Sequence, residues 1–490
     1  MRSFFSIESL IPQALDAYRA LILAAFETFL AMAPPERAVE LVAAQQSLPT
    51  DATSETRLVA CMRCCPTLHK LGQVLARDKR LSQSLRTELQ SLESLPSDRR
   101  VEEVRPVVER ELGDAIQQYE IRLGPAALAE GSVAIAWPLT WRAPGETETQ
   151  QAVAKIPHAG IRDRVAGELV AIGGVADLIA SQADRFGVNP DACRDVFDKT
   201  RRLLLRELDA PGEQANLVAA GRQYRANPKV RVPALTPFCT TDITAMSRLG
   251  GTKITDVHDA SSSQRKRLAE HLVEAIFAQP AFASDCDALF HGDPHAGNIL
   301  RMEDECVGLL DWSLAARLDA DQRRSLAQMF IAGLTLDASE LARRLAAFAS
   351  GRPSEPATRN VAEASIAEID MSRGVGVNWL LATLDRAALA GLPASADALI
   401  LRKSLHTLTG VVEDVAPSMS IDQIVMRHGL SAFGSELGAR GFAWPTQSDF
   451  GVRLSNMDLW RACMSASLTP LRYWRNTLMR IGNRADEPRR

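Results

Sequence analysis

One short segment, residues 291–311, limits what this chain can be more than any other part of it. A carboxylate, Asp293, and a carboxamide, Asn298, stand five positions apart in a turn-rich loop, and an apolar strand candidate then leads to a second carboxylate, Asp311. Oxygen ligands of this kind hold Mg²⁺ beside phosphate groups, and a further carboxylate orients an attacking hydroxyl or water. The segment therefore predicts a loop and strand that serve phosphoryl transfer.

The spacing of these residues matches a known pattern. Kinase catalytic loops have the form H-R-D-x-x-x-x-N, followed by D-F-G. Here Asp293 and Asn298 keep the five-residue step, and Asp311-Trp312-Ser313 occupies the second motif. Capping of loop and strand ends is the alternative, but it does not explain why the residues coincide at this spacing. Upstream, Lys155 in the alternating segment 151–156 stands where a kinase lysine neutralises the α- and β-phosphates, with an exposed strand lysine as the alternative.

Length and composition narrow the class of protein further. At roughly 150 residues per domain, the 490 residues allow several domains, and 46% hydrophobic with 24% charged residues is typical of soluble globular proteins. Because 56 basic side chains are balanced by 60 acidic ones, no global positive field exists and nucleic acid is not an expected partner. Eight irregularly spaced cysteines indicate reduced thiols, and no run of 18 uncharged apolar residues occurs. We expect a cytoplasmic protein, either free or attached peripherally to a membrane.

Periodicity predicts helices around a small sheet. Residues 11–32 form an amphipathic helix that ends at Pro34-Pro35, and its acidic polar face favours packing on the body over lying on a membrane. Helical patterns also cover 57–120, 162–224 and most of the chain after residue 251. Strand candidates lie within 126–156, 230–235, 242–249 and 307–310.

The string HGDPHAGNIL with LLDWS resembles two families: the aminoglycoside/choline phosphotransferases and the UbiB-like atypical kinases, also called aarF-domain-containing (ADCK) kinases. Upstream motifs favour the second. Lys70-Leu-Gly-Gln73 resembles its Lys-x-Gly-Gln helix, Glu207-Leu-Asp209 with Glu213-Gln-Ala-Asn216 is similar to its Glu-x-Asp helix, and residues 244–256 resemble its hinge. The resemblance covers about residues 60–425.

This resemblance implies a two-lobed, protein-kinase-like α+β fold with extra helices at both ends. The implied segments are an N-terminal amphipathic segment (1–55), a helical extension with the Lys-x-Gly-Gln motif (56–120), an antiparallel-sheet N-lobe (121–250), a mainly helical C-lobe (251–425) and a C-terminal helical tail (426–490).

The family also implies roles for residues that match its motifs. Lys155 is expected to contact the phosphates and to pair with Glu207, with Glu168 in reserve, while Asp293 takes the catalytic-base position. Asn298 and Asp311 are the expected Mg²⁺ ligands. The remaining ATP-binding candidates are a phosphate loop with Gly131 and Ser132, a hinge at Ser247 to Leu249, and a helix over the active site whose Lys70 and Gln73 lie near Glu207 and Asp209.

The implied activity is that of a Mg-ATP-dependent ATPase or a kinase of a small or lipid-like acceptor, in isoprenoid-quinone (ubiquinone) or lipid metabolism. An aminoglycoside/choline-type phosphotransferase and a non-enzymatic nucleotide-binding regulator remain alternatives. Glu130 in the phosphate loop and Ser313 in place of the usual glycine are the departures that favour a regulator.

Two weaker signals have ordinary explanations. Cys61, Cys64 and Cys65 with His69 have no second ligand pair at zinc spacing, so buried helix thiols are favoured over a soft-metal site. Three C-terminal tryptophans, Trp444, Trp460 and Trp474, are expected to pack a helical cap.

Overall fold

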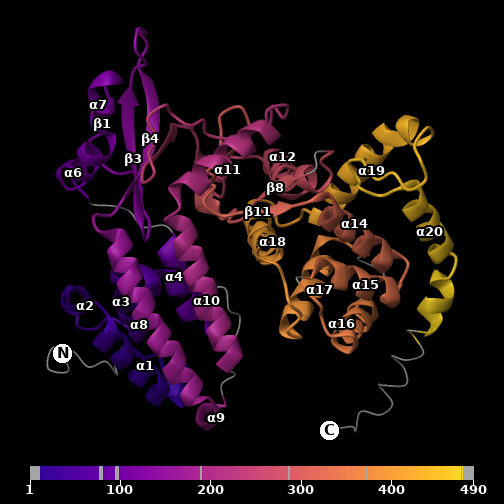
Figure 1. Cartoon of the computed structure of the whole chain (residues 1–490), viewed down its shortest axis with the longest axis horizontal. Coiled ribbons are helices and arrows are strands. Elements are labelled where there is room, and N and C mark those ends of the chain that lie inside the picture. Colours follow the sequence, from indigo (N-terminus) through magenta and orange to yellow (C-terminus); the bar gives the residue numbers. More distant parts are fainter. Residues whose placement is uncertain are drawn as a thin grey trace. The chain divides into compact units, whose positions relative to one another are not determined.

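The computed structural model describes residues 11–76, 81–93, 99–187, 190–284, 287–349, 351–369, 374–475 and 477. The chain divides into two compact units (Figure 1). The first comprises residues 1–215 and 234–248, and the second comprises 216–233 and 249–490. The division falls within helix α11 (Ala210–Gln223).

The first unit contains an antiparallel sheet in the order β1-β3-β4-β6, with β2 also paired to β3. Its strands are β1 (Arg122–Leu123), β2 (Ala129–Glu130), β3 (Ala134–Trp141), β4 (Gln150–Pro157) and β6 (Thr244–Ser247). Alternate residues of β3 are buried, because successive side chains of a strand point to opposite faces. The apolar face packs with Val104, Val107 and Val108 of α6 into one core. The predicted small antiparallel sheet is confirmed.

Helices make up the rest of the first unit. In chain order they are η2 (Gln13–Tyr18), α1 (Arg19–Met32), α2 (Pro35–Gln46), α3 (Ser54–Cys64), α4 (Pro66–Leu75), α5 (Gln83–Gln90), η3 (Ser91–Glu93), α6 (Val101–Leu112), α7 (Ala115–Gln118), α8 (Ile161–Ser181), α9 (Ala183–Phe186) and α10 (Pro190–Glu207). The first predicted helix is a 3₁₀ turn followed by α1, which packs on α8 and buries Leu21 and Phe29. Its packing on the body is confirmed.

The second unit is mainly helical, with two small sheets. One has the order β5-β10-β9-β7 and the other pairs β8 with β11. Their strands are β5 (Val230–Arg231), β7 (Thr252–Lys253), β8 (Ala288–His291), β9 (Ile299–Arg301), β10 (Val307–Leu309) and β11 (Ala315–Leu318). The helices are α12 (Ser262–Val273), η4 (Glu274–Ala278), α13 (Gln279–Ala281), η5 (Ala296–Asn298), α14 (Ala320–Leu334), α15 (Ala338–Phe348), α16 (Glu355–Ala367), α17 (Val377–Leu389), α18 (Ala396–Val415), α19 (Ile421–Arg440) and α20 (Asn456–Ala466).

The C-terminal tryptophans correct a prediction. Trp444, Trp460 and Trp474 are 80%, 61% and 64% exposed, so they do not form a packed cap. Arg440 of α19 packs on the following loop, with its guanidinium 3.9 Å from the centre of the Phe450 ring. Apolar character alone did not reveal which aromatic side chains face inward. Among the described residues, no helix has the length and apolar character needed to cross a membrane.

Candidate active site

The loop that carries Asp293 lies between β8 and β9 of the second unit and is held by His291. The buried His291 ring donates from Nε2 to the Leu310 carbonyl at 2.7 Å, and its Nδ1 accepts the Asp293 backbone N–H at 3.2 Å. Burial lowers the pKa of His291, in agreement with a neutral ring that donates at one nitrogen and accepts at the other. His291 therefore fixes the backbone on which Asp293 stands.

Asn298 lies at the end of the β9–β10 hairpin, next to the loop. Its carbonyl accepts the N–H of Leu310 at 2.8 Å, so residues 298 and 310 continue the antiparallel pairing of the two strands. The Asn298 amide nitrogen donates to the Asp293 carbonyl at 3.1 Å, which leaves the amide oxygen as the end that can bind a cation. The loop and the hairpin are thus joined at the predicted metal ligand.

Asp311 follows Leu310, whose N–H bonds to the Asn298 carbonyl, and therefore lies at the same end of the hairpin as Asn298. Its backbone is left-handed, with φ of 52°, a conformation that aspartate tolerates better than most residues. Its Oδ1 accepts the backbone N–H and the hydroxyl of Ser313 at 3.1 and 2.7 Å. One carboxylate and one amide oxygen fit Mg²⁺, which proteins commonly hold by one or two side chains together with substrate phosphates.

In the first unit, Lys155 on β4 has a different partner from the predicted one. Its Nζ lies 2.5 Å from Oε1 of Glu213, whose side chain is only 6% exposed. The expected pairing with Glu207 is therefore wrong. Glu207 is the last residue of α10, whereas Glu213 lies in the first turn of α11, and the chain turns between the two helices.

Glu207 instead forms an ion pair with the Lys70 ammonium of α4. The second carboxylate oxygen of Glu207 accepts a hydrogen bond from the Ser132 hydroxyl at 3.0 Å. The Lys70 side chain is only 8% exposed. The helix with the Lys-x-Gly-Gln motif is thereby tied to both α10 and the turn that carries Ser132. Lys70, Ser132 and Glu207, three of the predicted site residues, meet as one polar cluster.

Two other predicted pocket residues are engaged locally. Gln73 donates from Nε2 to the Leu92 carbonyl at 2.9 Å and so braces the helical extension. Asp209 accepts the Gly212 N–H at 3.0 Å and caps the start of α11. Their roles in nucleotide binding remain predictions.

Glu168, the reserve partner of Lys155, is fully buried elsewhere in the first unit. Its Oε2 accepts the backbone N–H and the hydroxyl of Thr67 at 3.0 and 2.5 Å, and Oε1 lies 3.7 Å from Nε of Arg37. Burial raises the pKa of the Glu168 carboxyl. Glu168 therefore holds the start of α4 against α8, and the reserve assignment is also wrong.

The predicted phosphate loop is a tight turn between β2 and β3. The Gly131 N–H donates to the Ala134 carbonyl at 2.8 Å, and the Gly131 carbonyl accepts Nε2 of His158 at 3.0 Å. Glu130 is bonded by Nε of Arg99 at 3.1 Å, so its negative charge is partly offset. Binding of phosphates by Gly131 and Ser132 remains a prediction.

The predicted hinge falls at the division between the two units. The Ser247 N–H donates to the Ala234 carbonyl at 2.7 Å, and the Ser247 hydroxyl accepts the Ala234 N–H at 2.9 Å. Leu249 is the first residue of the second unit's main segment. The Ser247 N–H is thus already used within the first unit, and contact of adenine with the backbone at Leu249 remains a prediction.

The model of the ABC1 atypical kinase-like domain matches residues 92–345, slightly more than half of the chain. This chain belongs to the ABC1 family. The UbiB-like assignment made from the sequence is confirmed, and so is the kinase-like fold class.

Several named ABC1 relatives align with parts of the chain. A probable protein kinase UbiB of Serratia proteamaculans is 27% identical over 49% of this chain and 43% of its own length. The probable protein kinase UbiB of Cronobacter sakazakii is 32% identical over 29% of this chain and 27% of its own length. The chloroplastic protein ACTIVITY OF BC1 COMPLEX KINASE 1 of Arabidopsis thaliana is 25% identical over 56% of this chain and 40% of its own length. A structure of Rv3197 with erythromycin from Mycobacterium tuberculosis aligns over 80% of this chain and 87% of that one, at a TM-score of 0.49 and 15% identity. The chain spans less than half the length of these three curated relatives.

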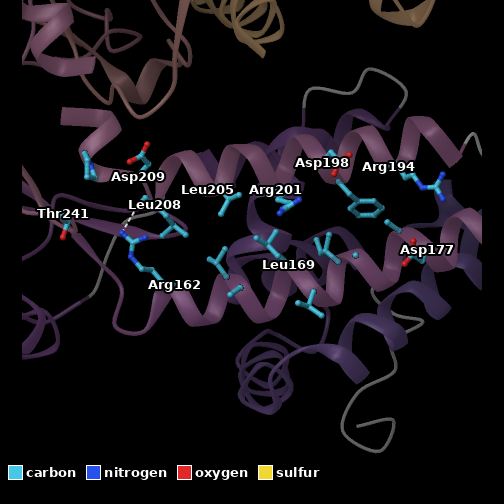
Figure 2. A pocket seen from close by; sticks show the side chains of 18 residues that line it. Arg162, Leu169, Asp177, Arg194, Asp198, Arg201, Leu205, Leu208, Asp209 and Thr241 are labelled. Carbon is cyan, nitrogen blue, oxygen red and sulfur yellow. Dashed lines mark hydrogen bonds between the residues drawn. The ribbon is translucent and has the colours of Figure 1, made fainter. Parts of the chain in front are cut away.

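This ABC1 chain also contains a groove between α8 and α10 of the first unit, with a volume of about 930 Å³ (Figure 2). Its apolar wall includes Leu169, Leu205 and Leu208, and Arg201 points into it (Figure 2). At one end Arg162 bonds to Asp242 at 2.6 Å. Sequence reasoning missed this groove, because helical periodicity marks the apolar positions of α8 and α10 without showing that the two helices leave a hollow between them.

Sequence reasoning missed two site residues of this ABC1 chain. Glu213 stood in a recognised motif, but the motif alone did not show that it faces Lys155. Lys403 on α18 carried no signal, although its Nζ lies 2.7 Å from Oδ2 of Asp293. In the described part of the chain, no group of three or more His, Cys, Asp or Glu side chains is arranged to hold an ion.

Proposed function

We propose that this chain binds Mg-ATP and acts as an ATPase or as a kinase of a small or lipid-like acceptor. The observation that carries the proposal is the meeting of Asp293, Asn298 and Asp311 at one end of the β9–β10 hairpin. This is the arrangement that phosphoryl transfer needs, with two oxygen ligands for the metal and a separate carboxylate for the attacking group. Lys155, held by buried Glu213, supports it with a cation for the α- and β-phosphates.

In the proposed reaction, the oxygen of a water or an acceptor alcohol forms a bond to the γ-phosphorus. The bond between the γ-phosphorus and the β,γ-bridging oxygen breaks, and ADP leaves with that electron pair. Asp293 orients the attacking hydroxyl and takes its proton. Bound Mg²⁺ neutralises phosphate charge, and Asn298 and Asp311 are the residues that would hold it.

The acceptor is proposed to be small or lipid-like. Lys70 and Thr67 tie α4 to α10 and to buried Glu168, so the helix with the Lys-x-Gly-Gln motif is firmly held. The exclusion of protein-sized substrates by this helix is taken from the family resemblance and is part of the proposal. The groove between α8 and α10 is lined by apolar and charged side chains and has the volume of a ligand site, which supports an amphipathic, lipid-like ligand. A setting in isoprenoid-quinone metabolism follows from the family resemblance alone.

Mg-ATP binding and phosphate release test this proposal. We expect saturating Mg-ATP to raise the melting temperature, since a ligand at 100 times its Kd adds about 2.7 kcal/mol to folded-state stability. Asp311→Asn should lose most phosphate release and weaken the Mg²⁺ dependence of binding. Asp304→Asn is the matched control, because Asp304 is an exposed aspartate of the same hairpin. Absence of any thermal shift in the wild type would reject the proposal, and binding without turnover would favour a regulator.

A peripheral contact with an anionic membrane surface is the proposed partner interaction. Phe442, Trp444, Trp460 and Trp474 are all more than 60% exposed. Arg461 and Arg475, the neighbours of Trp460 and Trp474 in the chain, are exposed as well, whereas Arg440 and Arg453 of the same segment are buried. Exposed aromatic side chains next to arginines are typical of surfaces that lie in a lipid headgroup region.

Sedimentation with vesicles tests the membrane contact. We expect the wild type to bind vesicles with about 30% phosphatidylserine and to bind neutral vesicles weakly, because basic residues near an anionic surface each add roughly 1 kcal/mol. Serine at Trp444, Trp460 and Trp474 together should abolish binding. Self-association of the wild type that the triple variant loses, without any vesicle binding, would show that a second copy covers this surface instead.

A further inference from the structure

The catalytic loop lacks a basic side chain of its own. Residues 291–300 read HGDPHAGNIL and contain neither lysine nor arginine, and Gly292 stands where the kinase pattern H-R-D has arginine. Phosphoryl transfer nevertheless spreads negative charge over the γ-phosphoryl oxygens, and catalysis depends on cations placed beside them. A basic side chain near Asp293 must therefore come from another element of the fold.

Gly292 allows helix α18 to pack directly on this loop. A Cβ at Gly292 would lie 2.6 Å from Cγ2 of Ile400 and 2.7 Å from the Leu314 carbonyl oxygen, so a side chain has no room there. One turn further along α18, the Ser404 hydroxyl donates to the His291 carbonyl at 2.7 Å. The helix is thus attached to the loop on both sides of Gly292.

This packing brings Lys403 to Asp293. The Nζ of Lys403 lies 2.7 Å from Oδ2 of Asp293, and the two side chains are 17% and 20% exposed. The neighbouring basic residue, Arg402, bonds instead to Asp385 of α17 at 2.6 Å. The cation at the loop is therefore held in place on a helix whose inner face is buried along most of its length.

We propose that Lys403 is a further catalytic residue, which binds the γ-phosphoryl oxygens beside Asp293 in place of the cation that the loop lacks. This inference rests on the proposed function. Lys403 keeps its three protons throughout: Asp293 takes the proton of the attacking hydroxyl, and the ammonium neutralises charge on the transferred group while ADP leaves. Because the Lys403 ammonium also touches Asp293, it holds that carboxylate toward the attacking oxygen.

The test compares Lys403→Met, Lys403→Arg and Arg402→Met in steady-state phosphate release, with Mg-ATP thermal shifts for each. We expect Lys403→Met to lower kcat by about 10²–10³-fold, as removal of one transition-state contact does, with a KM for ATP within roughly threefold of the wild type. The kcat of Lys403→Arg should be at least tenfold higher than the kcat of Lys403→Met. Arg402→Met, the adjacent control, should retain kcat within about twofold.

A merely structural ion pair would behave differently. In that case Lys403→Met would lower the melting temperature and leave the kcat of the folded protein intact, and this result would overturn the inference. Should Lys403→Met not fold, Lys403→Gln compared with Lys403→Arg decides the same question. Failure of the proposed function is distinct, because the wild type itself would then show neither a Mg-ATP shift nor phosphate release, and both proposals would fall.

Discussion

At the scale of single residues, two lysine–glutamate ion pairs of the first unit have different roles. Glu213 takes Lys155 of the sheet, and Glu207 takes Lys70 of the helical extension. The acidic residues are only six positions apart, yet each lies on its own helix and serves a different lysine. The first pair belongs to the proposed phosphate site, and the second fixes α4.

Exchange of these glutamates should separate the two roles. Glu213→Gln removes the buried carboxylate charge beside the Lys155 ammonium, so we expect kcat/KM for ATP to fall about 10–100-fold, equivalent to roughly 1.4–2.7 kcal/mol. Glu207→Gln removes the carboxylate charge beside the Lys70 ammonium and should change kcat/KM by less than about fivefold, while α4 becomes easier to cleave in limited proteolysis. Equal losses of kcat/KM in the two variants would contradict this division.

Buried Glu168 should give the first unit a pH-dependent stability. Burial raises the pKa of its carboxyl above the ordinary 4.5, so the folded chain keeps this proton to a higher pH than the unfolded chain. The stabilising contribution of the protonated Glu168 carboxyl to the free energy of unfolding is complete below pH 4.5, and it is lost as pH rises through the folded-state pKa. We therefore expect Glu168→Gln to gain in melting temperature relative to the wild type as pH rises from about 4.5 to 8.

Differential scanning calorimetry of both proteins across that range measures the effect. Glu36→Gln, at an exposed position of α2, is the control and should follow the wild type at every pH. A melting temperature of Glu168→Gln that instead falls relative to the wild type as pH rises would show that the carboxylate form is the stabilising one.

At the scale of elements, local motifs were predictable and contacts between distant elements were not. Asp293, Asn298 and Asp311 lie within nineteen positions on one hairpin, so their spacing alone places them together. The partner of Lys155 depends on how α11 turns away from α10, which the spacing of Glu207 and Glu213 does not show. Lys403 is 110 positions from Asp293, and only the packing of α18 brings it near.

The glycine of the Lys-x-Gly-Gln helix shows why an element can require one residue type. A Cβ at Gly72 would lie 2.5 Å from Cδ1 of Leu92 and 2.9 Å from Sδ of Met62. Gly72→Ala should therefore overpack the extension and destabilise it by about 1–3 kcal/mol in thermal or urea unfolding. Gly173→Ala in α8 is the matched control, since nothing lies within 4 Å of its Cβ position. Helix propensity then predicts a change between zero and a gain of about 1 kcal/mol. Equal effects would contradict the packing explanation.

At the scale of the whole molecule, five of the seven tryptophans lie at the two extremes of exposure. Trp137 and Trp312 are fully buried in the first and second unit, whereas the three C-terminal tryptophans are mostly exposed. Each of the single substitutions Trp444→Ser, Trp460→Ser and Trp474→Ser should change the free energy of unfolding by less than about 0.5 kcal/mol. Trp137→Ala should cost about 3–5 kcal/mol. Urea unfolding followed by circular dichroism checks both values, and a large loss at an exposed tryptophan would show that it is covered in the folded protein.

The packing of α18 on Gly292 has a consequence for where this domain is cut. The family match ends at residue 345, but α18 runs from Ala396 to Val415. A protein truncated at 345 would retain every motif residue and still lose the helix that covers Gly292, which leaves the catalytic loop with an open apolar flank. Recombinant fragments of such chains should therefore include the helix equivalent to α18. A related sequence should be regarded as an intact domain only if it contains that helix.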